Sequence, residues 1–364
     1  MSLTDLADPA DLPDDVVSLI GRRRHVRDTT FAAERGHGFA SCASVHNGNP
    51  LFWDETVAEE LTGGPILPPS TLSLWSRPHA WDPQVGSGPA PLPSHFDLKE
   101  RFGLPDAVIS AAALTLLDPV RPGDRMVTGE TLRSVSEEKV TALGSGRFWV
   151  IDVDYRNDRD DLVGVETLTG FGYHGAGGPV PASAPGPAAV GGPASEASPG
   201  DGPSLSPRRR LALGEVSVGD RLPDLVHELT VTDVVLGATA ARDWRPMHHD
   251  PAFARARSGV ANIFLDTPTQ QAWFERHLTD WTGPTGRLGR LDLRMGRPVL
   301  AGTTMTLSAE VEAVAVDADG CGWVTLVGSI AVDGTVHSDA RSRLALPTRP
   351  GDNPWTRRGA DWLP

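Results

Sequence analysis

The sequence predicts an α+β protein in which two similar halves each contain a loop, a helix and several long antiparallel strands. Three observations lead to this class. A proline-containing loop occurs once in each half, a helix signal follows the second copy of that loop, and stretches with the two-residue periodicity of half-buried strands follow in both halves.

The second copy of the loop, residues 241–250, carries an acid and a base. Asp243 and His248 stand five positions apart with Pro246 between them. Proline lacks an N–H and disfavours helical geometry at the preceding residue, so we expect a bent loop that aims both side chains into one cavity. Proton transfer next to a carbonyl requires such a pair. On these residues alone, a solvated surface loop is an equally good interpretation.

The first copy of the loop, residues 47–54, lacks that pair. The residues that coincide at one spacing of 196 positions are Pro50 with Pro246 and Asp54 with Asp250. At the same spacing, Asn47 stands where Asp243 stands, and Phe52 stands where His248 stands. The sequence therefore predicts one loop used twice, with its acid and base present only in the second half.

The regions after the loops also match. Residues 119–126 resemble residues 298–305 at a shorter spacing of 179 positions, so the first half carries extra residues, which we place in the Pro/Gly-rich stretch 82–93. Residues 323–332 and 335–346 flank Asp333-Gly334, a strong hairpin signal. Residues 147–155 and 162–173 flank a longer polar turn and form the corresponding pair of strands in the first half.

A helix is expected to begin near Pro268 and to run for roughly fourteen residues. Thr267 as N-cap, Pro268 at the first helical position and Gln270 behind it resemble a capping box, and Gly283-Pro284 ends the helix. A weaker counterpart begins at Pro68-Pro69 in the first half.

Composition sets the domain boundaries and excludes several classes of protein. Residues 175–207 contain 16 Gly or Pro in 33 positions and should form a disordered linker between domains at 1–174 and 208–364.

A net charge of −14 argues against nucleic acid as a partner. The two cysteines show no metal-ligand spacing, and there is no apolar run of signal-peptide or membrane-span length. These features favour a reduced, cytoplasmic protein without a metal or membrane partner.

The second half resembles the MaoC-like hydratases and dehydratases, whose signature is Asp-x-Asn-Pro-aliphatic-His-x-Asp followed by Ala. The residues that fit are Asp243, Pro246, Met247, His248, Asp250 and Ala254. Arg245 replaces the signature Asn. The first half resembles the companion N-terminal MaoC-type dehydratase domain, through Asn49-Pro50, Pro68-Pro69 and Pro122-Gly123-Asp124.

The resemblance implies a double hotdog, in which each half has a bent antiparallel sheet wrapped around a long helix. It also implies acyl thioesters of coenzyme A or a carrier protein as substrates, no cofactor, and Asp243 and His248 as the catalytic pair. The family usually has His-Gly where its central helix begins, whereas this chain has Leu265-Asp266-Thr267. Free N–H groups near Asp266 and Thr267 remain the candidates for binding the thioester oxygen.

The expected reaction is reversible hydration of a 2-enoyl thioester to a 3-hydroxyacyl thioester. His249 is the alternative imidazole if the loop register shifts by one, and a metal site at His248, His249 and Asp250 is a weaker alternative. Asn47 and Phe52 are candidates for lining the acyl tunnel. A hotdog thioesterase, an enoyl-thioester cyclase and a non-catalytic acyl-thioester-binding partner of another hotdog subunit remain alternatives. Two assemblies stay open, a homodimer and a pairing with another hotdog subunit.

Overall fold

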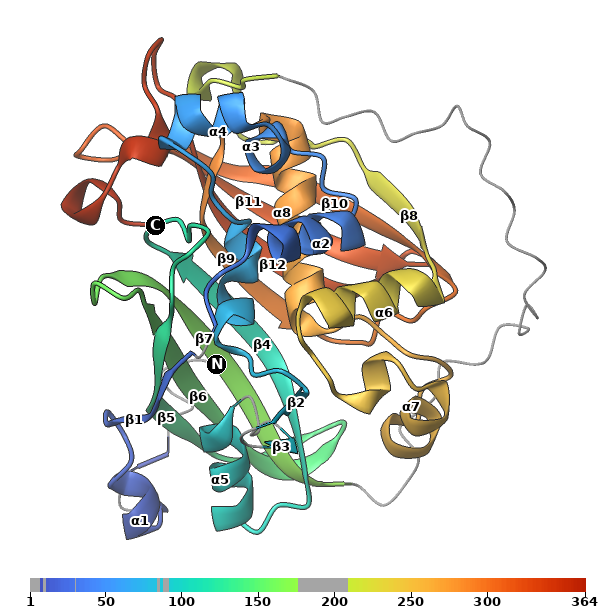
Figure 1. Ribbon diagram of the computed structural model, residues 1–364. Coiled ribbons are helices and arrows are strands. Elements are labelled where there is room, and N and C mark those ends of the chain that lie inside the picture. The colour runs from blue at the N-terminus through green and yellow to red at the C-terminus, as the bar shows by residue number, and fades with distance from the viewer. Residues whose placement is uncertain (1–6, 9–10, 30, 84–85, 88–91, 176–208) are drawn as a thin grey trace.

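A computed structural model describes the chain except for residues 1–6, 9–10, 30, 84–85, 88–91 and 176–208 (Figure 1). The predicted linker at 175–207 therefore lies, from residue 176 onward, outside the described residues. Within the described part, no helix is long and apolar enough to cross a membrane.

One antiparallel sheet of ten strands runs through both halves in the order β1-β5-β6-β7-β4-β9-β12-β11-β10-β8 (Figure 1). The first half supplies β1 Arg23–Asp28, β4 Asp106–Leu116, β5 Val127–Thr141, β6 Gly144–Arg156 and β7 Leu162–Gly175. The second half supplies β8 Leu225–Leu229, β9 Arg287–Met295, β10 Thr303–Val316, β11 Gly322–Val332 and β12 Thr335–Leu346.

The strand order has mirror symmetry about the pair β4–β9, where the halves meet edge to edge from Ala111 opposite Arg294 to Thr115 opposite Arg290. Strands β1, β5, β6, β7 and β4 correspond in turn to β8, β10, β11, β12 and β9. This correspondence confirms the duplication predicted from the repeated loop. The predicted hairpin is also confirmed, because Asp333 and Gly334 both adopt positive φ between β11 and β12.

The helices of the two halves gather on one side of the sheet, where α2 packs against α6 (Figure 1). Their bounds are α1 Asp14–Val17, α2 Arg35–Ser44, α3 Pro50–Trp53, α4 Glu55–Thr62, α5 Pro93–Arg101, α6 Val231–Ala240, α7 Pro251–Ser258 and α8 Thr267–Thr282. Short 3₁₀ helices are η3 Pro69–Ser76, η4 Leu213–Glu215, η5 Pro246–His248, η6 Pro354–Thr356 and η7 Gly359–Asp361.

The central helix of the second half is α8, close to the prediction, but its N-cap is different. The side chain of Asp266 accepts the Thr269 N–H at 2.7 Å, so Asp266 is the N-cap and Thr267 is the first helical residue. The predicted capping box at Thr267 is therefore wrong by one position. Aspartate is among the best N-cap residues, which explains why it takes this place.

The expectation of a long central helix in the first half is wrong. Only the eight-residue 3₁₀ helix η3 occupies this place, packed against α8. Pro78 follows Arg77, whose backbone is extended, so the helix cannot continue. A small hairpin, β2 Trp81–Asp82 with β3 Gly86–Ser87, and helix α5 then precede β4, at the predicted insertion.

Most apolar side chains of both halves belong to one continuous core. Two smaller clusters involve the C-terminal tail. Trp355 packs with Cys42, Leu51, Phe52, Leu61 and Ile66 of the first half, and Trp362 packs with Cys321, Trp323 and Ala345. The tail therefore connects regions that are far apart in the sequence.

Candidate active site

The loop with the predicted acid and base begins where α6 ends. Arg242 has a φ of 49°, in the left-handed region that side chains other than glycine rarely adopt. This reversal lets the Asp243 N–H return to the Ala238 carbonyl at 2.8 Å. Pro246 then starts the single turn η5, which contains His248, and Asp250 caps α7. The bent loop predicted from Pro246 is thus present.

Asp243 is 4% exposed and is bound by two arginines. Arg245 donates from Nε to Oδ1 at 2.9 Å and from Nη2 to Oδ2 at 2.7 Å, and Nη1 of Arg77 lies 3.4 Å from Oδ2. Burial by itself would raise the pKa of Asp243, but the charges of Arg245 and Arg77 outweigh it and hold this pKa well below its usual value. Asp243 is therefore a fixed anion.

His248 is 1% exposed, and its contacts define its protonation state. Its Nδ1 lies 2.8 Å from the carbonyl oxygen of Phe264, which can only accept, so Nδ1 carries a hydrogen. The other nitrogen, Nε2, lies 3.9 Å from Asp243 Oδ2 and 3.4 Å from Arg245 Nη2, which can only donate. This arrangement leaves Nε2 without a hydrogen, with its lone pair facing the Arg245 guanidinium.

The first half takes part in the site, which the sequence did not predict. Arg77 comes from the end of η3, and the Trp244 indole donates to the Pro78 carbonyl at 3.1 Å. On the other side of the loop, His37 Nε2 donates to the Ala240 carbonyl at 2.9 Å. Three contacts from the first half thus fix the position of this loop.

Further titratable side chains of the first half lie within electrostatic range. His95 of α5 accepts the Trp149 indole N–H at 3.1 Å, and burial together with Arg245 lowers its pKa to about 4. Glu166 of β7 accepts the Tyr155 hydroxyl at 3.1 Å, and burial raises its pKa against the opposing charge of Arg77. These residues have no motif around them, so only the shared sheet brings them to the site.

The start of α8 also differs from the predicted oxyanion site. Pro268 has no N–H, and the Thr269 N–H is already bound by the Asp266 carboxylate. The Thr267 hydroxyl donates to the Met295 sulfur at 3.3 Å. The first turn of α8 therefore offers fewer free donors than expected.

The remaining predicted residues lie elsewhere or have other partners. Asn47 is buried, and its side-chain oxygen accepts the Asn49 N–H at 3.0 Å. Phe52 packs in the apolar cluster with Trp355, which is a core position. The side chain of His249 is exposed. Within the described residues, no three His, Cys, Asp or Glu side chains are grouped to hold a metal ion, so the geometry gives no support to the metal alternative.

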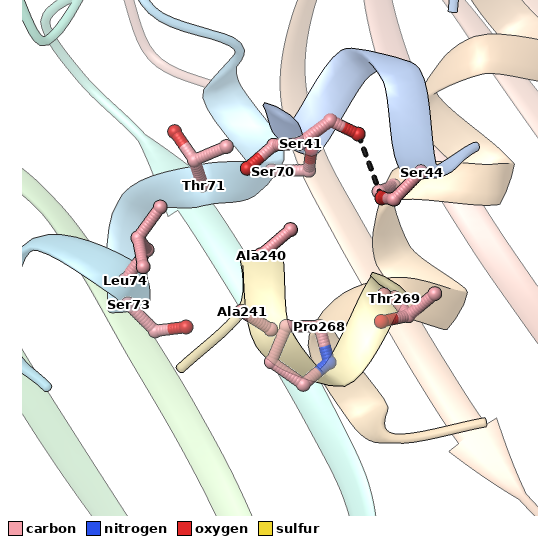
Figure 2. Close-up of a pocket in the computed structure, with 12 residues that line it drawn as sticks. Ser41, Ser44, Ser70, Thr71, Ser73, Leu74, Ala240, Ala241, Pro268 and Thr269 are labelled. Carbon is pink, nitrogen blue, oxygen red and sulfur yellow. Dashed lines mark hydrogen bonds between the residues drawn. The ribbon is translucent and has the colours of Figure 1, made fainter. Parts of the chain in front are cut away.

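A small pocket lies between the two halves, beside the loop and the start of α8 (Figure 2). Four helical segments line it with small side chains: Ser41 and Ser44 of α2, Ser70, Thr71, Ser73 and Leu74 of η3, Gly237, Ala240 and Ala241 at the end of α6, and Pro268, Thr269 and Ala272 of α8. Asp243, His248 and Asp266 are not among the residues that line this pocket.

Comparisons with known proteins identify relatives of this chain. No family model matches. Over 97 residues, 27% of this chain and 74% of the relative, the chain is 39% identical to the Mycobacterium tuberculosis 3-oxo-4,17-pregnadiene-20-carboxyl-CoA hydratase beta subunit.

The fold of this chain matches those of several solved structures over most of its length. A MaoC-like dehydratase matches 90% of this chain and 99% of its own with a TM-score of 0.63 at 16% identity. A MaoC domain dehydratase from Chloroflexus aurantiacus matches 90% and 96% with a TM-score of 0.61 at 13% identity. A Mycobacterium tuberculosis protein described as a double hotdog matches 89% and 96% with a TM-score of 0.57 at 15% identity.

The structural matches confirm the expected double hotdog, and the sequence match covers most of a hydratase subunit. With the duplicated sheet and the Asp243–His248 loop in place, these findings lead to one conclusion. The chain belongs to the MaoC-like family of hydratases and dehydratases.

Proposed function

We propose that the protein is a hydro-lyase that interconverts a 2-enoyl thioester and a 3-hydroxyacyl thioester. The observation that carries the proposal is the buried imidazole of His248, whose Nδ1–H donates to the Phe264 carbonyl and whose Nε2 carries no hydrogen, 3.9 Å from an ionised Asp243. A general base needs such a fixed, unprotonated nitrogen beside a group that stabilises the cation it becomes.

In the proposed hydration, His248 Nε2 takes a proton from water while the water oxygen forms a bond to C3. The electron pair of the C2–C3 double bond moves toward the thioester oxygen, and a proton is then delivered to C2. Asp243 stays ionised throughout and stabilises the imidazolium. Both proton transfers use side chains, so the proposal includes no cofactor.

The catalytic pair would act as a unit with the first half. Arg77 and Arg245 neutralise Asp243 and leave a net positive charge beside the reacting atoms, since two guanidinium groups face one carboxylate. A positive field favours the negative charge that develops on the thioester oxygen. This field supplements the few N–H donors that remain at the start of α8.

The substrate class follows from the relative and remains part of the proposal. The name of the M. tuberculosis relative describes a ring-bearing 20-carboxyl-CoA substrate and a beta subunit. By analogy, we propose a coenzyme A thioester as substrate and a second hotdog subunit as partner. A carrier-protein thioester and a homodimer are the alternatives.

The test is a panel of 2-enoyl-CoA substrates of increasing acyl size, assayed with the full-length chain alone and after co-expression with candidate hotdog subunits. Loss of the enoyl absorbance without release of free thiol supports a hydratase. Thiol release at the same rate would instead identify a thioesterase, and no change with any substrate would contradict both.

A further inference from the structure

The proposed hydration needs a proton donor for C2, and the fixed charge of Asp243 excludes that residue. Both carboxylate oxygens of Asp243 accept short bonds from Arg245, and Arg77 lies beside Oδ2. A carboxylate so surrounded by guanidinium groups does not bind a proton near neutral pH. The remaining candidates are the imidazolium that His248 becomes and a further acid near the site.

Asp266 is placed differently. It is 2% exposed, and Oδ1 accepts the Thr269 N–H, whereas Oδ2 makes no hydrogen bond of regular geometry within the described residues. The N–H and the hydroxyl of Thr269 lower the pKa of this carboxyl, against its burial. An unpaired oxygen in a buried carboxylate is costly, whereas a protonated carboxyl group tolerates the same site. The groups that act on Asp266 electrostatically are Asp243, His248 and Arg245 of the catalytic loop.

The backbone holds this carboxyl within electrostatic range of His248. Phe264, two residues before Asp266, accepts the His248 Nδ1–H, so one short segment positions both groups. Burial and the negative charge of Asp243 raise the pKa of Asp266, opposite to the shift of Asp243. When two carboxyl groups have oppositely shifted pKa values, the group with the raised pKa can act as an acid and the other stays an anion, as in other acid–base sites. Here the first group is Asp266 and the second is Asp243.

We infer that Asp266 is a further catalytic residue, the acid that delivers the proton to C2, while His248 is the base and Asp243 exchanges no proton. The inference rests on the proposed hydration. In the step, the Asp266 O–H bond breaks, a C2–H bond forms, and the electron pair of the enolate becomes that bond. Asp266 is left ionised. The proton that His248 took from water then passes from His248 to Asp266, and both groups are back in their starting states.

The structure supplies a variant that removes the acid without removing the helix cap. Asn caps helices as well as Asp does, so Asp266→Asn should keep the Thr269 N–H satisfied and α8 intact. Asp266→Ser is a second capping variant without a carboxyl group. The matched control is Asp54→Asn, because Asp54 caps α4 in the first half by accepting the Thr56 N–H at 2.9 Å.

We expect Asp266→Asn and Asp266→Ser to lower kcat for hydration by about 10²- to 10⁴-fold, the usual range for loss of one general acid. The melting temperature should stay near that of the unchanged protein, and Asp54→Asn should keep full activity. In the unchanged protein, kcat should fall as pH rises through the raised pKa of Asp266. This decline should be missing from the residual activity of both Asp266 variants.

A second readout isolates the proton transfer at C2. A saturated acyl-CoA cannot be hydrated, but an acid–base group above C2 exchanges its α-hydrogens with deuterium from heavy water. The unchanged protein and Asp54→Asn should catalyse this exchange, and Asp266→Asn should not. If the unchanged protein hydrates enoyl-CoA while Asp266→Asn matches it in kcat and exchange, only the Asp266 assignment falls. If the unchanged protein hydrates no substrate, the proposed function is wrong, and the assignment of Asp266 that rests on it is wrong as well.

Discussion

At the scale of single residues, the replacement of the signature Asn by Arg245 defines this site. Arg245 binds both oxygens of Asp243, and Arg77 adds a second positive charge from the other half. The pair Asp243 and His248 therefore consists of an ionised carboxylate and an imidazole whose Nδ1–H donates to the Phe264 carbonyl. The adjacent His249 is exposed, whereas His248 is buried, and we therefore propose His248 as the base.

We expect His248→Ala to lower kcat for hydration by about 10²- to 10⁴-fold, because it removes the proposed base. Asp243→Asn should also lose most activity, because the imidazolium loses its counter-charge and two guanidinium groups lose their partner. The matched control is His249→Ala, which should stay active with an unchanged melting temperature. An inactive His249→Ala beside an active His248→Ala would contradict the assignment.

Phe52 stands at the position equivalent to His248 but belongs to an apolar cluster with Leu51, Leu61 and Trp355. We expect Phe52→Ala to lower the free energy of unfolding by about 3–5 kcal/mol through the cavity it leaves. Values of kcat and KM at a temperature where the variant is folded should be unchanged. Chemical denaturation beside steady-state kinetics checks this, and a changed substrate preference with unchanged stability would favour a role in the acyl tunnel.

At the scale of elements, the two halves differ most in the central helix. Helix α8 has 16 residues, whereas η3 has eight and ends before Pro78. A hydrogen bond joins the two helices, in which buried Glu275 of α8 accepts the Ser70 N–H at 2.7 Å. The other oxygen, Oε1, has no partner among the described residues.

This contact predicts a pH dependence of stability. Burial raises the pKa of Glu275 from 4.5 to about 7, so between these values the unfolded chain releases a proton that the folded chain retains. The free energy of unfolding should therefore fall as pH rises through this window, by roughly 3 kcal/mol from this group. Below pH 4.5 the group contributes no penalty.

The variant Glu275→Gln cannot ionise and should lack this decline. Its stability relative to the unchanged protein should rise between pH 4.5 and pH 7.5, as measured by denaturant unfolding at several pH values. Glu59→Gln, at an exposed carboxylate of α4, serves as the control and should follow the unchanged protein. A parallel pH profile for Glu275→Gln would show that Glu275 ionises normally in the folded state.

At the scale of the whole molecule, the C-terminal tail joins the halves. The Trp362 indole donates to the Leu116 carbonyl at 2.7 Å, and Asn353 donates to the Leu61 carbonyl at 2.7 Å, both in the first half. Arg287 of β9 lies over the Trp362 ring at 3.6 Å. The tail thus adds a further connection to the edge pairing of β4 with β9 and the helix contacts between the halves.

Removing residues 350–364 should lower the melting temperature by several degrees. Each buried tryptophan contributes on the order of 4 kcal/mol of apolar burial. The point variants Trp355→Ala and Trp362→Ala should each account for part of the loss. Differential scanning calorimetry of the three proteins checks this, and an unchanged melting temperature after truncation would mean that the tail does not stabilise the folded chain.

The sequence by itself determined the features that depend on local pattern. The repeated loop, the hairpin at Asp333-Gly334 and the length of α8 follow from turn residues and from periodicity, which are properties of neighbouring positions. The bend at Pro246 follows from the missing N–H of proline. From these features the sequence predicted the α+β class, the duplication and the candidate pair Asp243 and His248.

Only the tertiary structure decided which charges surround that pair. Arg77 and Asp243 are distant in the chain and meet because β4 pairs with β9 and brings η3 against α8. No local pattern records such a contact, since it depends on how two halves of one sheet join. The cap at Asp266 was missed by one residue for a related reason. The choice between Asp266 and Thr267 depends on which side chain reaches the Thr269 N–H. The path of the backbone before α8 decides this, and that path includes Phe264, whose carbonyl contacts His248.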